Sequence, residues 1–338
     1  MESKKRVTLL DIANATGYTI NTVSRALKNK DDISRETCQR IQEVARSMGY
    51  VRNYMAGALR SGRTKTIGLI LSEVSNPYYA VMADEIQNVL VSLGYSLMIL
   101  CSRDDPNLEL RVVETAMSRQ VDGILLFPCH GSRATIRRMK AAGMPYVLMS
   151  RKLKGSPSDS VVCDEEEGAY LACRHLLAAG RRTLGYLSAF DVLYSTEERR
   201  KGFLRACNEA GIPKEKQLIS LAGGKTKMEK IILDWYGKGL DGLFVFCDIE
   251  AWETISVLEQ HRIRVPEDVA IVGFDNIQDS LCFPKPICSV DSQIKQVITT
   301  AIDLLRKRIH NDEMPLQSIT IPAHIVCRGS CGCHSIRK

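Results

Sequence analysis

Residues 9–28 read LLDIANATGYTINTVSRALK, and this stretch has the chemistry of two short helices that cross at a tight turn. A close crossing needs a small residue at the contact, which Ala13 supplies, and the turn needs a residue that accepts a left-handed backbone, which Gly17 supplies. Val23 gives the second helix an apolar contact with the first. The stretch therefore predicts a helix-turn-helix, with an ordinary helical hairpin as the alternative.

Three helix starts are marked by capping residues. Thr8 and Thr19 can cap the two helices of this motif, and Ser34 can cap a third helix. Apolar residues recur at helical spacing in that third segment, at Ile41, Val44, Ala45 and Met48. We therefore expect an all-α head of three helices in the first 50 residues.

The start of the second helix presents side chains that suit a DNA major groove. Asn21 and Arg25 can make bidentate contacts with adenine and guanine edges, and Ile20 suits a thymine methyl group. Thr22 and Ser24 lie in the same two turns. We predict that this helix reads double-stranded DNA.

The charge distribution points to the same partner. The chain of 338 residues carries a net charge of +7. Residues 1–65 contain 13 Lys/Arg and 6 Asp/Glu, so all of the net charge lies there and the remainder is balanced. A basic balance confined to one unit favours a polyanion for that unit alone, although a solvated basic face is the alternative.

From Lys65 onward, short apolar strands alternate with amphipathic helices, which is typical of parallel sheets covered by helices on both faces. The pattern occurs twice, because Thr66 matches Thr183 and Asp122 matches Asp241, at offsets of 117 and 119 residues. We predict two doubly wound parallel α/β sheets with a ligand cleft between them. The expected strands are 67–71, 97–100, 123–127, 146–149, 184–187, 218–221, 242–246 and 269–272.

Enzyme motifs fail on context. The glycine-rich stretch 237–242 precedes a strand instead of following one, so it cannot place a helix N-terminus on a pyrophosphate. Gly224-Lys225-Thr226 lacks the earlier glycine of a phosphate loop, because Ile219 stands there. We expect no catalytic activity and no cofactor. A free-standing solute-binding protein is a further alternative, since the two-lobed part resembles periplasmic sugar-binding proteins.

The twelve cysteines lack paired spacing, and Cys101, Cys163 and Cys247 lie within apolar runs. We interpret them as small buried hydrophobic residues. The stretch with Cys327, Cys331, Cys333 and His334 has residue types that bind metals, but its Cys-Gly-Cys spacing is too tight for a usual zinc knuckle. We therefore expect no metal.

The chain resembles the LacI/GalR family of bacterial transcriptional regulators over nearly its whole length. The residues that carry the resemblance are Val7-Thr8-Leu9-Leu10-Asp11-Ile12-Ala13, Thr22-Val23-Ser24-Arg25-Ala26-Leu27, Gly49-Tyr50-Val51-Arg52-Asn53 and Ala58-Leu59-Arg60-Ser61-Gly62-Arg63-Thr64-Lys65-Thr66-Ile67-Gly68. The resemblance implies a hinge helix over 53–60 that contacts DNA through Asn53, Ala56 and Leu59, with Leu59 as an apolar wedge in the minor groove. It also implies DNA contacts from Thr8, Thr19, Ile20, Asn21, Thr22, Ser24 and Arg25.

Ligand positions follow from the same resemblance, one motif at a time. The loop 76–79, the arginine before Gly202-Phe203 and the aspartate of 272–276 match family positions that line the cleft. The effector-binding residues that it implies are Tyr78, Tyr79, Arg151, Ser195, Arg199, Asp248 and Asp275. A carboxylate and a guanidinium can bracket vicinal hydroxyls, and tyrosines can cover a sugar ring. Structural salt bridges are the alternative for Arg199 and Asp275, and packing is the alternative for the tyrosines.

The resulting prediction is a ligand-responsive, sequence-specific regulator, a repressor of carbohydrate-related genes. We expect a homodimer on a pseudo-palindromic operator, with a sugar or sugar derivative as effector and no membrane contact. The start of the chain has no apolar stretch of the signal-peptide kind, so a cytoplasmic location is expected. The expected parts are a DNA-binding domain 1–52, a hinge 53–64, a sensor 65–330 and a tail 331–338, with lobe 1 at about 65–162 and 291–316 and lobe 2 at about 163–290 and 317–330.

Overall fold

The computed structural model describes residues 7–51, 62–153, 155–190, 193–221, 225–283, 285–311 and 313–333. The chain forms two compact units, Met1–Thr64 and Lys65–Lys338, called the head and the sensor below. The hinge predictions for Asn53, Ala56 and Leu59, and the tail residue His334, lie outside the described residues.

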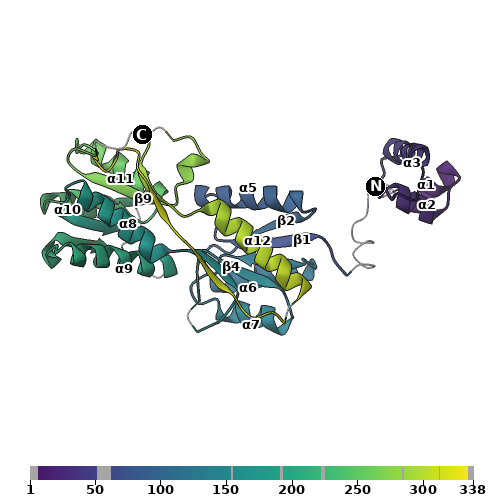
Figure 1. Ribbon diagram of the computed structural model, residues 1–338, viewed down its shortest axis with the longest axis horizontal. Helices are drawn as coiled ribbons and strands as arrows, with labels where there is room; N and C mark the ends of the chain where they lie inside the picture. The colour runs from purple at the N-terminus through teal and green to yellow at the C-terminus, as the bar shows by residue number, and fades with distance from the viewer. Residues whose placement is uncertain are drawn as a thin grey trace. The chain divides into compact units, whose positions relative to one another are not determined.

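The described residues of the head form the helices α1 (Leu9–Thr16), α2 (Ile20–Ala26) and α3 (Arg35–Ser47) (Figure 1). Thr8 caps α1 in a capping box with Asp11, and Thr19 and Ser34 cap the other two helices. Gly17 ends α1 with φ 76°, and its N–H donates to the Ala13 carbonyl at 2.9 Å. The predicted helix-turn-helix is therefore confirmed down to its turn residue.

The core of the head is small and apolar. It consists of Ile12, Ala13, Val23, Ala26, Ile41 and Ala45, so each of the three helices contributes two residues. Ala13 and Val23 lie where the sequence places the crossing contact. This packing leaves the opposite side of α2 free to face solvent.

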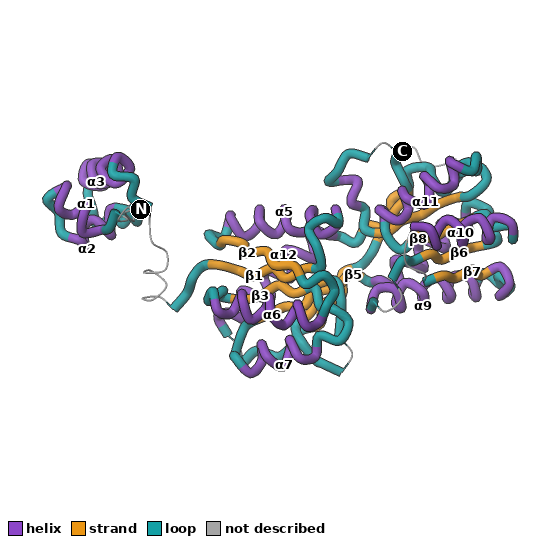
Figure 2. Tube along the Cα trace, turned by 180° about the vertical axis from the view of Figure 1, so that it is seen from behind, coloured by secondary structure: helices purple, strands orange, loops and turns teal. Residues whose placement is uncertain are grey.

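The first sheet of the sensor has the strand order β11-β5-β4-β3-β1-β2, and all of its neighbouring strands are parallel. Figures 1 and 2 show α5 and α12 on one face of this sheet and α6 and α7 on the other. Its strands are β1 (Thr66–Leu71), β2 (Ser96–Cys101), β3 (Gly123–Leu126), β4 (Tyr146–Met149), β5 (Ser160–Cys163) and β11 (Ser318–Ile321). The helices are α5 (Pro77–Ser92), α6 (Pro106–Ser118), α7 (Arg133–Ala141) and α12 (Ile294–His310).

The second sheet has the order β12-β10-β9-β8-β6-β7, and only the β10–β12 pair is antiparallel. Its strands are β6 (Leu184–Leu187), β7 (Gln217–Ser220), β8 (Gly242–Val245), β9 (Ala270–Phe274), β10 (Cys288–Asp291) and β12 (His324–Val326). Helices α8 (Glu165–Ala178) and α9 (Tyr194–Glu209) pack on one face, and α10 (Lys225–Gly237) and α11 (Asp248–Gln260) pack on the other. Two short 3-10 helices, η1 (Lys214–Lys216) and η2 (Ile277–Asp279), complete this lobe.

The eight predicted strands are all present, and the two-sheet architecture is confirmed. The chain passes between the lobes near residue 164, near 292–293 and between Ile321 and His324. The prediction that residues 317–330 belong entirely to lobe 2 is wrong, because β11 pairs with β5 in the first sheet, Ser318 beside Ser160. A strand of four residues does not reveal from its own pattern which sheet it joins.

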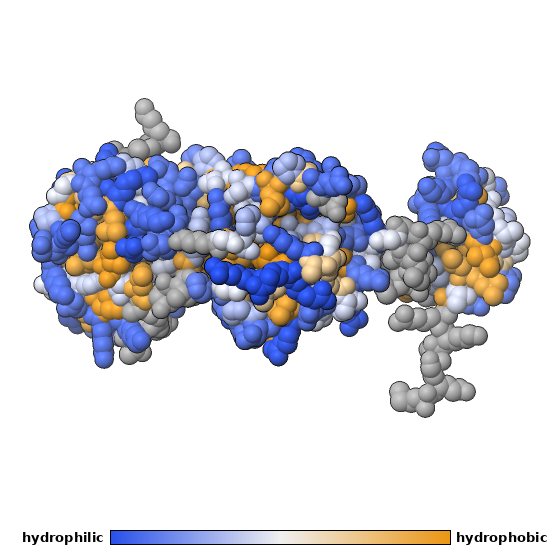
Figure 3. Space-filling view, turned by 90° about the horizontal axis from the view of Figure 1, so that it is seen from below, coloured by the Kyte–Doolittle hydropathy of each residue, from blue (hydrophilic) through white to orange (hydrophobic). Residues whose placement is uncertain are grey.

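Figure 3 shows mostly hydrophilic side chains on the face in view, with small hydrophobic areas between them. Among the described residues, no helix combines the length and the apolar character that a membrane crossing requires. Cys163 and Cys247 are buried as predicted, whereas Cys101 is only half-buried.

Candidate functional site

The outer face of α2 carries the residues predicted to read DNA. Ile20, Asn21 and Arg25 are exposed, and Thr22 and Ser24 are half-buried. Thr19 has a structural task as well, since its hydroxyl accepts the Thr22 N–H at 3.1 Å. Thr8 is likewise used as a cap, where it accepts the Asp11 N–H.

Arg25 is paired with Asp32 in the loop that follows α2. The Arg25 Nε lies 3.2 Å from an Asp32 carboxylate oxygen, and about half of each side chain is exposed. An exposed pair of this kind contributes only about 0–1 kcal/mol. The guanidinium is therefore free to exchange this partner for another acceptor.

A cleft lies between the two lobes of the sensor, where the carboxyl ends of both sheets meet. It encloses about 700 Å³, part of it open to solvent. The lobe 1 lining comes from segments that follow strands, at Ser72, Glu73, Asn76, Tyr78, Tyr79, Asp104, Phe127, Ser150 and Arg151. The lobe 2 lining has the same origin, at Glu165, Phe190, Leu193, Ser195, Arg199, Phe246, Cys247, Ile249 and Asp275.

On the lobe 1 side, one carboxylate and one phenol hold Arg151 in position. It donates to Asp104 at 2.7 Å and to the Tyr79 hydroxyl at 3.0 Å. Tyr78 makes a hydrogen bond of 2.9 Å with Ser150. Burial raises the pKa of Tyr79 to about 12, so its hydroxyl keeps its proton at neutral pH. This wall thus offers hydroxyl groups and one guanidinium whose orientation is set by its neighbours.

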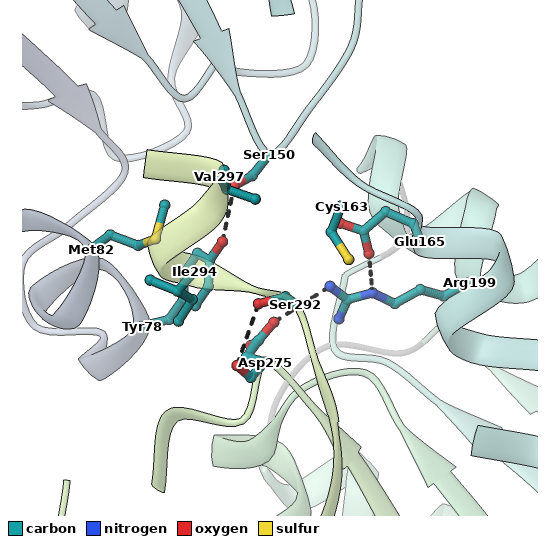
Figure 4. Close-up of a pocket in the computed structure, with 10 residues that line it drawn as sticks. All are labelled: Tyr78, Met82, Ser150, Cys163, Glu165, Arg199, Asp275, Ser292, Ile294 and Val297. Atoms are coloured by element: carbon teal, nitrogen blue, oxygen red, sulfur yellow. Dashed lines mark hydrogen bonds and ion pairs between the residues drawn. The ribbon is translucent and has the colours of Figure 1, made fainter. Parts of the chain in front are cut away.

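On the lobe 2 side, Arg199 lies between two carboxyl groups, as Figure 4 shows. Its Nε donates to Glu165 at 2.6 Å, its second amino group is 3.5 Å from Asp275, and it also donates to the carbonyl of Phe246. The guanidinium packs 3.5 Å from the centre of the Phe274 ring. Burial lowers the pKa of Arg199, but Glu165 and Asp275 raise it by more. Arg199 therefore stays charged at the floor of the cleft.

Asp275 occupies an unusual backbone conformation. Its φ is 102°, a region that side chains rarely adopt and that often marks functional sites. Its N–H donates to the Val290 carbonyl at 2.9 Å, which holds the residue in place at the end of β9. Burial raises the pKa of Asp275 well above its usual value, and Arg199 offsets part of that rise.

Two residues differ from the sequence-based expectation. Asp248 is fully buried, and its carboxylate accepts hydrogen bonds from Ser289 at 2.6 Å and from the Ile277 N–H at 3.0 Å, so it supports the loop after β9 instead of lining the cleft. Glu165 was not predicted as a site residue, yet its carboxylate lies closer to the Arg199 guanidinium than that of Asp275, at 2.6 Å against 3.5 Å. Its only sequence signal is a position in the acidic first turn of α8, where acidic residues are common for helix-dipole reasons alone.

Aromatic rings border the cleft on both lobes. Tyr79 and Phe127 form an edge-to-face pair at 5.3 Å on lobe 1, and Phe190 and Phe246 lie 5.3 Å apart on lobe 2. Ser195 is buried at the start of α9 and also lines the cleft. The cleft therefore combines apolar ring faces with a few fixed polar groups, the usual composition of a small-molecule site.

Two family models match the chain. One is described as bacterial regulatory proteins, lacI family, and matches residues 8–53. The other is described as a periplasmic binding protein-like domain and matches residues 173–331. The first covers the head and the second covers most of the second lobe, together with α12 and the strands that follow it.

Curated relatives extend over almost the whole chain. The HTH-type transcriptional regulator DegA of Bacillus subtilis (strain 168) is 31% identical over 334 residues, which is 96% of this chain and 98% of the relative. The HTH-type transcriptional repressor PurR of Aliivibrio fischeri (strain MJ11) is 26% identical over 96% of this chain and 98% of its own length.

Solved structures agree in fold. The Lac repressor bound to ONPG in the repressed state superposes with a TM-score of 0.83 at 20% identity, covering 96% of this chain and 100% of its own. A periplasmic binding protein/LacI transcriptional regulator from Alkaliphilus metalliredigens QYMF complexed with D-xylulofuranose gives a TM-score of 0.69 at 25% identity, covering 79% of this chain and 98% of its own.

Proposed function

This chain belongs to the lacI family of bacterial regulatory proteins, and on that premise we propose that it is a repressor of carbohydrate-related genes whose operator affinity is set by a sugar in the interlobe cleft. As a member of this family it is a ligand-responsive, DNA-binding transcriptional regulator. The proposal concerns the identity of its ligand class, its sites and its mode of binding. The observation that carries it is the pairing of charges in the cleft.

Both guanidinium groups of the cleft are already paired. Arg151 is matched by Asp104, and Arg199 is matched by Glu165 and Asp275. Among the described lining residues there are four carboxyl groups and two guanidinium groups, because Glu73 lines the cleft in addition to the three paired carboxyl groups. An anionic ligand would meet no unpaired cation there. A neutral polyhydroxyl ligand fits better, because each hydroxyl both donates to a carboxylate and accepts from a guanidinium.

Rings on both lobes suit the apolar C–H faces of a sugar. Tyr79 and Phe127 would border one side, and Phe190 and Phe246 the other. The relative from Alkaliphilus metalliredigens that was solved with D-xylulofuranose supports the same ligand class for this chain. A ligand that touches both lobes favours their closed arrangement by its differential affinity for the two states.

The DNA half of the proposal rests on the exposed face of α2 and on the basic charge of residues 1–65. A helix-turn-helix that binds as a dimer meets two half-sites, so we propose a pseudo-palindromic operator. Exposed apolar side chains at Val91 and Ile99 on lobe 1 are candidates for the surface that joins two copies. A DNA target also implies a cytoplasmic location, and control of transcription by binding alone requires no catalysis.

Arg25→Ala is expected to weaken operator binding by about 1–3 kcal/mol and to relax the preference at one base pair. The loss follows from removing a side chain that can donate two hydrogen bonds to a guanine edge. Competition titrations against operators with single base-pair changes measure both effects. Asp32→Ala is the matched control, because it breaks the same ion pair but keeps the guanidinium. If Asp32→Ala reproduced the change in base preference, Arg25 would act through the loop and not on a base.

Asp275→Asn tests the cleft, after a thermal-shift screen of sugars and purines has supplied a ligand. We expect ligand affinity to fall about 10- to 100-fold, because the charged acceptor is lost while the shape is kept. Calorimetric titration measures this loss, and Asp234→Asn, which changes an exposed aspartate outside the cleft, should keep the wild-type affinity.

The coupling of the two halves is tested with the same ligand. Titration into free protein and into the protein–operator complex should give affinities that differ by about 5- to 150-fold, since coupling is reciprocal. Equal affinities would reduce the sensor to a binding module without control over the head. A purine that bound while every sugar failed would overturn the ligand class.

A further inference from the structure

A cluster of sulfur and imidazole groups lies in lobe 2, apart from the cleft lining. It consists of His175, Cys288, Cys327, Cys331 and Cys333. His175 lies in the last turn of α8 and Cys288 begins β10. The other three follow β12, in the segment that returns across the sheet. Residues from three separate parts of the chain thus meet at one point.

Two sulfur–sulfur distances within the cluster match those of a tetrahedral metal centre. The Sγ atoms of Cys288 and Cys327 are 3.7 Å apart, and those of Cys327 and Cys331 are 3.6 Å apart. The Nε2 of His175 lies 3.0 Å from Cys331 Sγ, and the four ligand atoms all lie within 4.8 Å of one another. A tetrahedral ion with Zn–S bonds of about 2.3 Å places its sulfur ligands about 3.8 Å apart.

Backbone donors point at the sulfur atoms. The Arg328 N–H donates to Cys288 Sγ at 3.2 Å, and the Cys333 N–H donates to Cys331 Sγ at 3.4 Å. Such bonds stabilise thiolate more than thiol, and outer hydrogen bonds of this kind support metal ligands. Cys288 and Cys331 are buried, so water is kept from both atoms. The surroundings therefore form a closed site, in which a bound cation would offset the charge of the buried thiolates.

We propose that this cluster binds one zinc ion through His175, Cys288, Cys327 and Cys331. Three thiolates and one imidazole form a closed tetrahedral set, which is typical of structural zinc and leaves no open position for catalysis. Cys333 lies 2.9 Å from both Cys327 and Cys331 and is the neighbour available to exchange with either. The spacing of the cysteines near the end of the chain led us to expect no metal. The proposal replaces that expectation, because these cysteines supply only part of the ligand set.

The ion would fasten the segment after β12 to the body of lobe 2. In that segment Arg328 donates to Asn276 Oδ1 at 2.6 Å and to Asp279 at 2.5 Å, and Ser330 donates to the Ile271 carbonyl at 2.7 Å. Asn276 follows the cleft residue Asp275 directly. Zinc binding would therefore stabilise the loop that positions Asp275. The binding of zinc itself can be measured without any effector or DNA.

The test uses the full-length chain, reconstituted with zinc under reducing conditions and dialysed against a weak chelator. Elemental analysis should find about one zinc per chain in the wild type. Cys288→Ser and the double variant Cys331→Ser/Cys333→Ser should lose it, whereas Cys282→Ser, which changes an exposed cysteine, should retain it. Wild-type protein without bound zinc, or retention of zinc by both Cys288→Ser and the double variant, would overturn the proposal.

Two further measurements cover the case in which a variant fails to fold. Cobalt(II) added to the metal-free wild type should give the visible absorption of a sulfur-rich tetrahedral site, and one equivalent should saturate it. A strong chelator should lower the melting temperature of the wild type, and zinc should restore it. Two results together would exclude the zinc site. The folded, metal-free protein would bind no cobalt, and a sample denatured without reductant would contain a disulfide among Cys327, Cys331 and Cys333, which would make the cluster a redox pair.

Discussion

Arg199→Ala is expected to destabilise the sensor by about 3–5 kcal/mol and to abolish ligand binding. The side chain is 5% exposed, and its removal leaves Glu165 and Asp275 buried without their cation. It also leaves the carbonyl of Phe246 without a donor. The cost therefore arises from the partners left behind more than from the lost attraction.

Unfolding of the sensor in denaturant measures the change in its free energy of unfolding, and Arg200→Ala is the matched control. Arg200 is the next residue on α9, but its ion pair with Glu197 is partly exposed, so its loss should cost about 0–1 kcal/mol. An equal loss in the free energy of unfolding for the two substitutions would show that the buried ion pairs stabilise the sensor no more than an exposed pair does. Wild-type ligand affinity in Arg199→Ala would remove the residue from the site.

The pH dependence of this variant has a definite sign. Burial raises the pKa of Glu165 and of Asp275, and Arg199 opposes both shifts. Without Arg199 both folded-state pKa values rise further above their unfolded values. Such groups favour the folded state when protonated, and that contribution is lost as the pH rises. The destabilisation by Arg199→Ala should therefore shrink as the pH falls below neutrality.

A fragment of residues 65–338 is expected to lose all detectable affinity for duplex DNA and to keep its ligand affinity. The reason is that the net charge of +7 lies within residues 1–65 and the cleft lies within the Lys65–Lys338 unit. For the full chain, a dimer that neutralises about 6–10 phosphates should lose about 10³- to 10⁵-fold in affinity between about 50 and 200 mM salt.

Fluorescence anisotropy with labelled operator measures both halves of this expectation. Ligand titration of the fragment is the internal control, because it shows that the sensor is folded. Operator binding by the fragment comparable to that of the full chain would overturn the assignment of DNA binding to the head. A flat salt response of the full chain would show that phosphate contacts do not dominate its affinity.

Features encoded by neighbouring residues were predictable from the sequence. The head follows from caps and one left-handed turn residue, all within a few positions of one another. The eight predicted strands are continuous apolar runs, and most cleft residues directly follow such strands. Here the local pattern and the tertiary structure agree, so the sequence is informative.

Features that depend on distant partners were not predictable. The edge strand β11 shows its sheet only through its pairing with β5. Asp248 and Asp275 both follow strands, and only the folded loop shows that the first carboxylate turns toward Ser289 while the second lines the cleft. His175 and Cys331 are 156 positions apart in sequence, which no spacing rule would join.

The triple passage of the chain between the lobes also sets an order for its synthesis. Strand β5 is complete at Cys163, but the partner of its outer edge, β11, is made only at residues 318–321, and β12 closes the other sheet at 324–326. At about 5–20 residues per second, the ribosome leaves that edge unpaired for roughly 8–30 s. Exposed strand edges invite aggregation. The growing chain therefore carries this exposed edge until residues 318–321 emerge, and the two sheets then gain β11 and β12 within a few residues of each other.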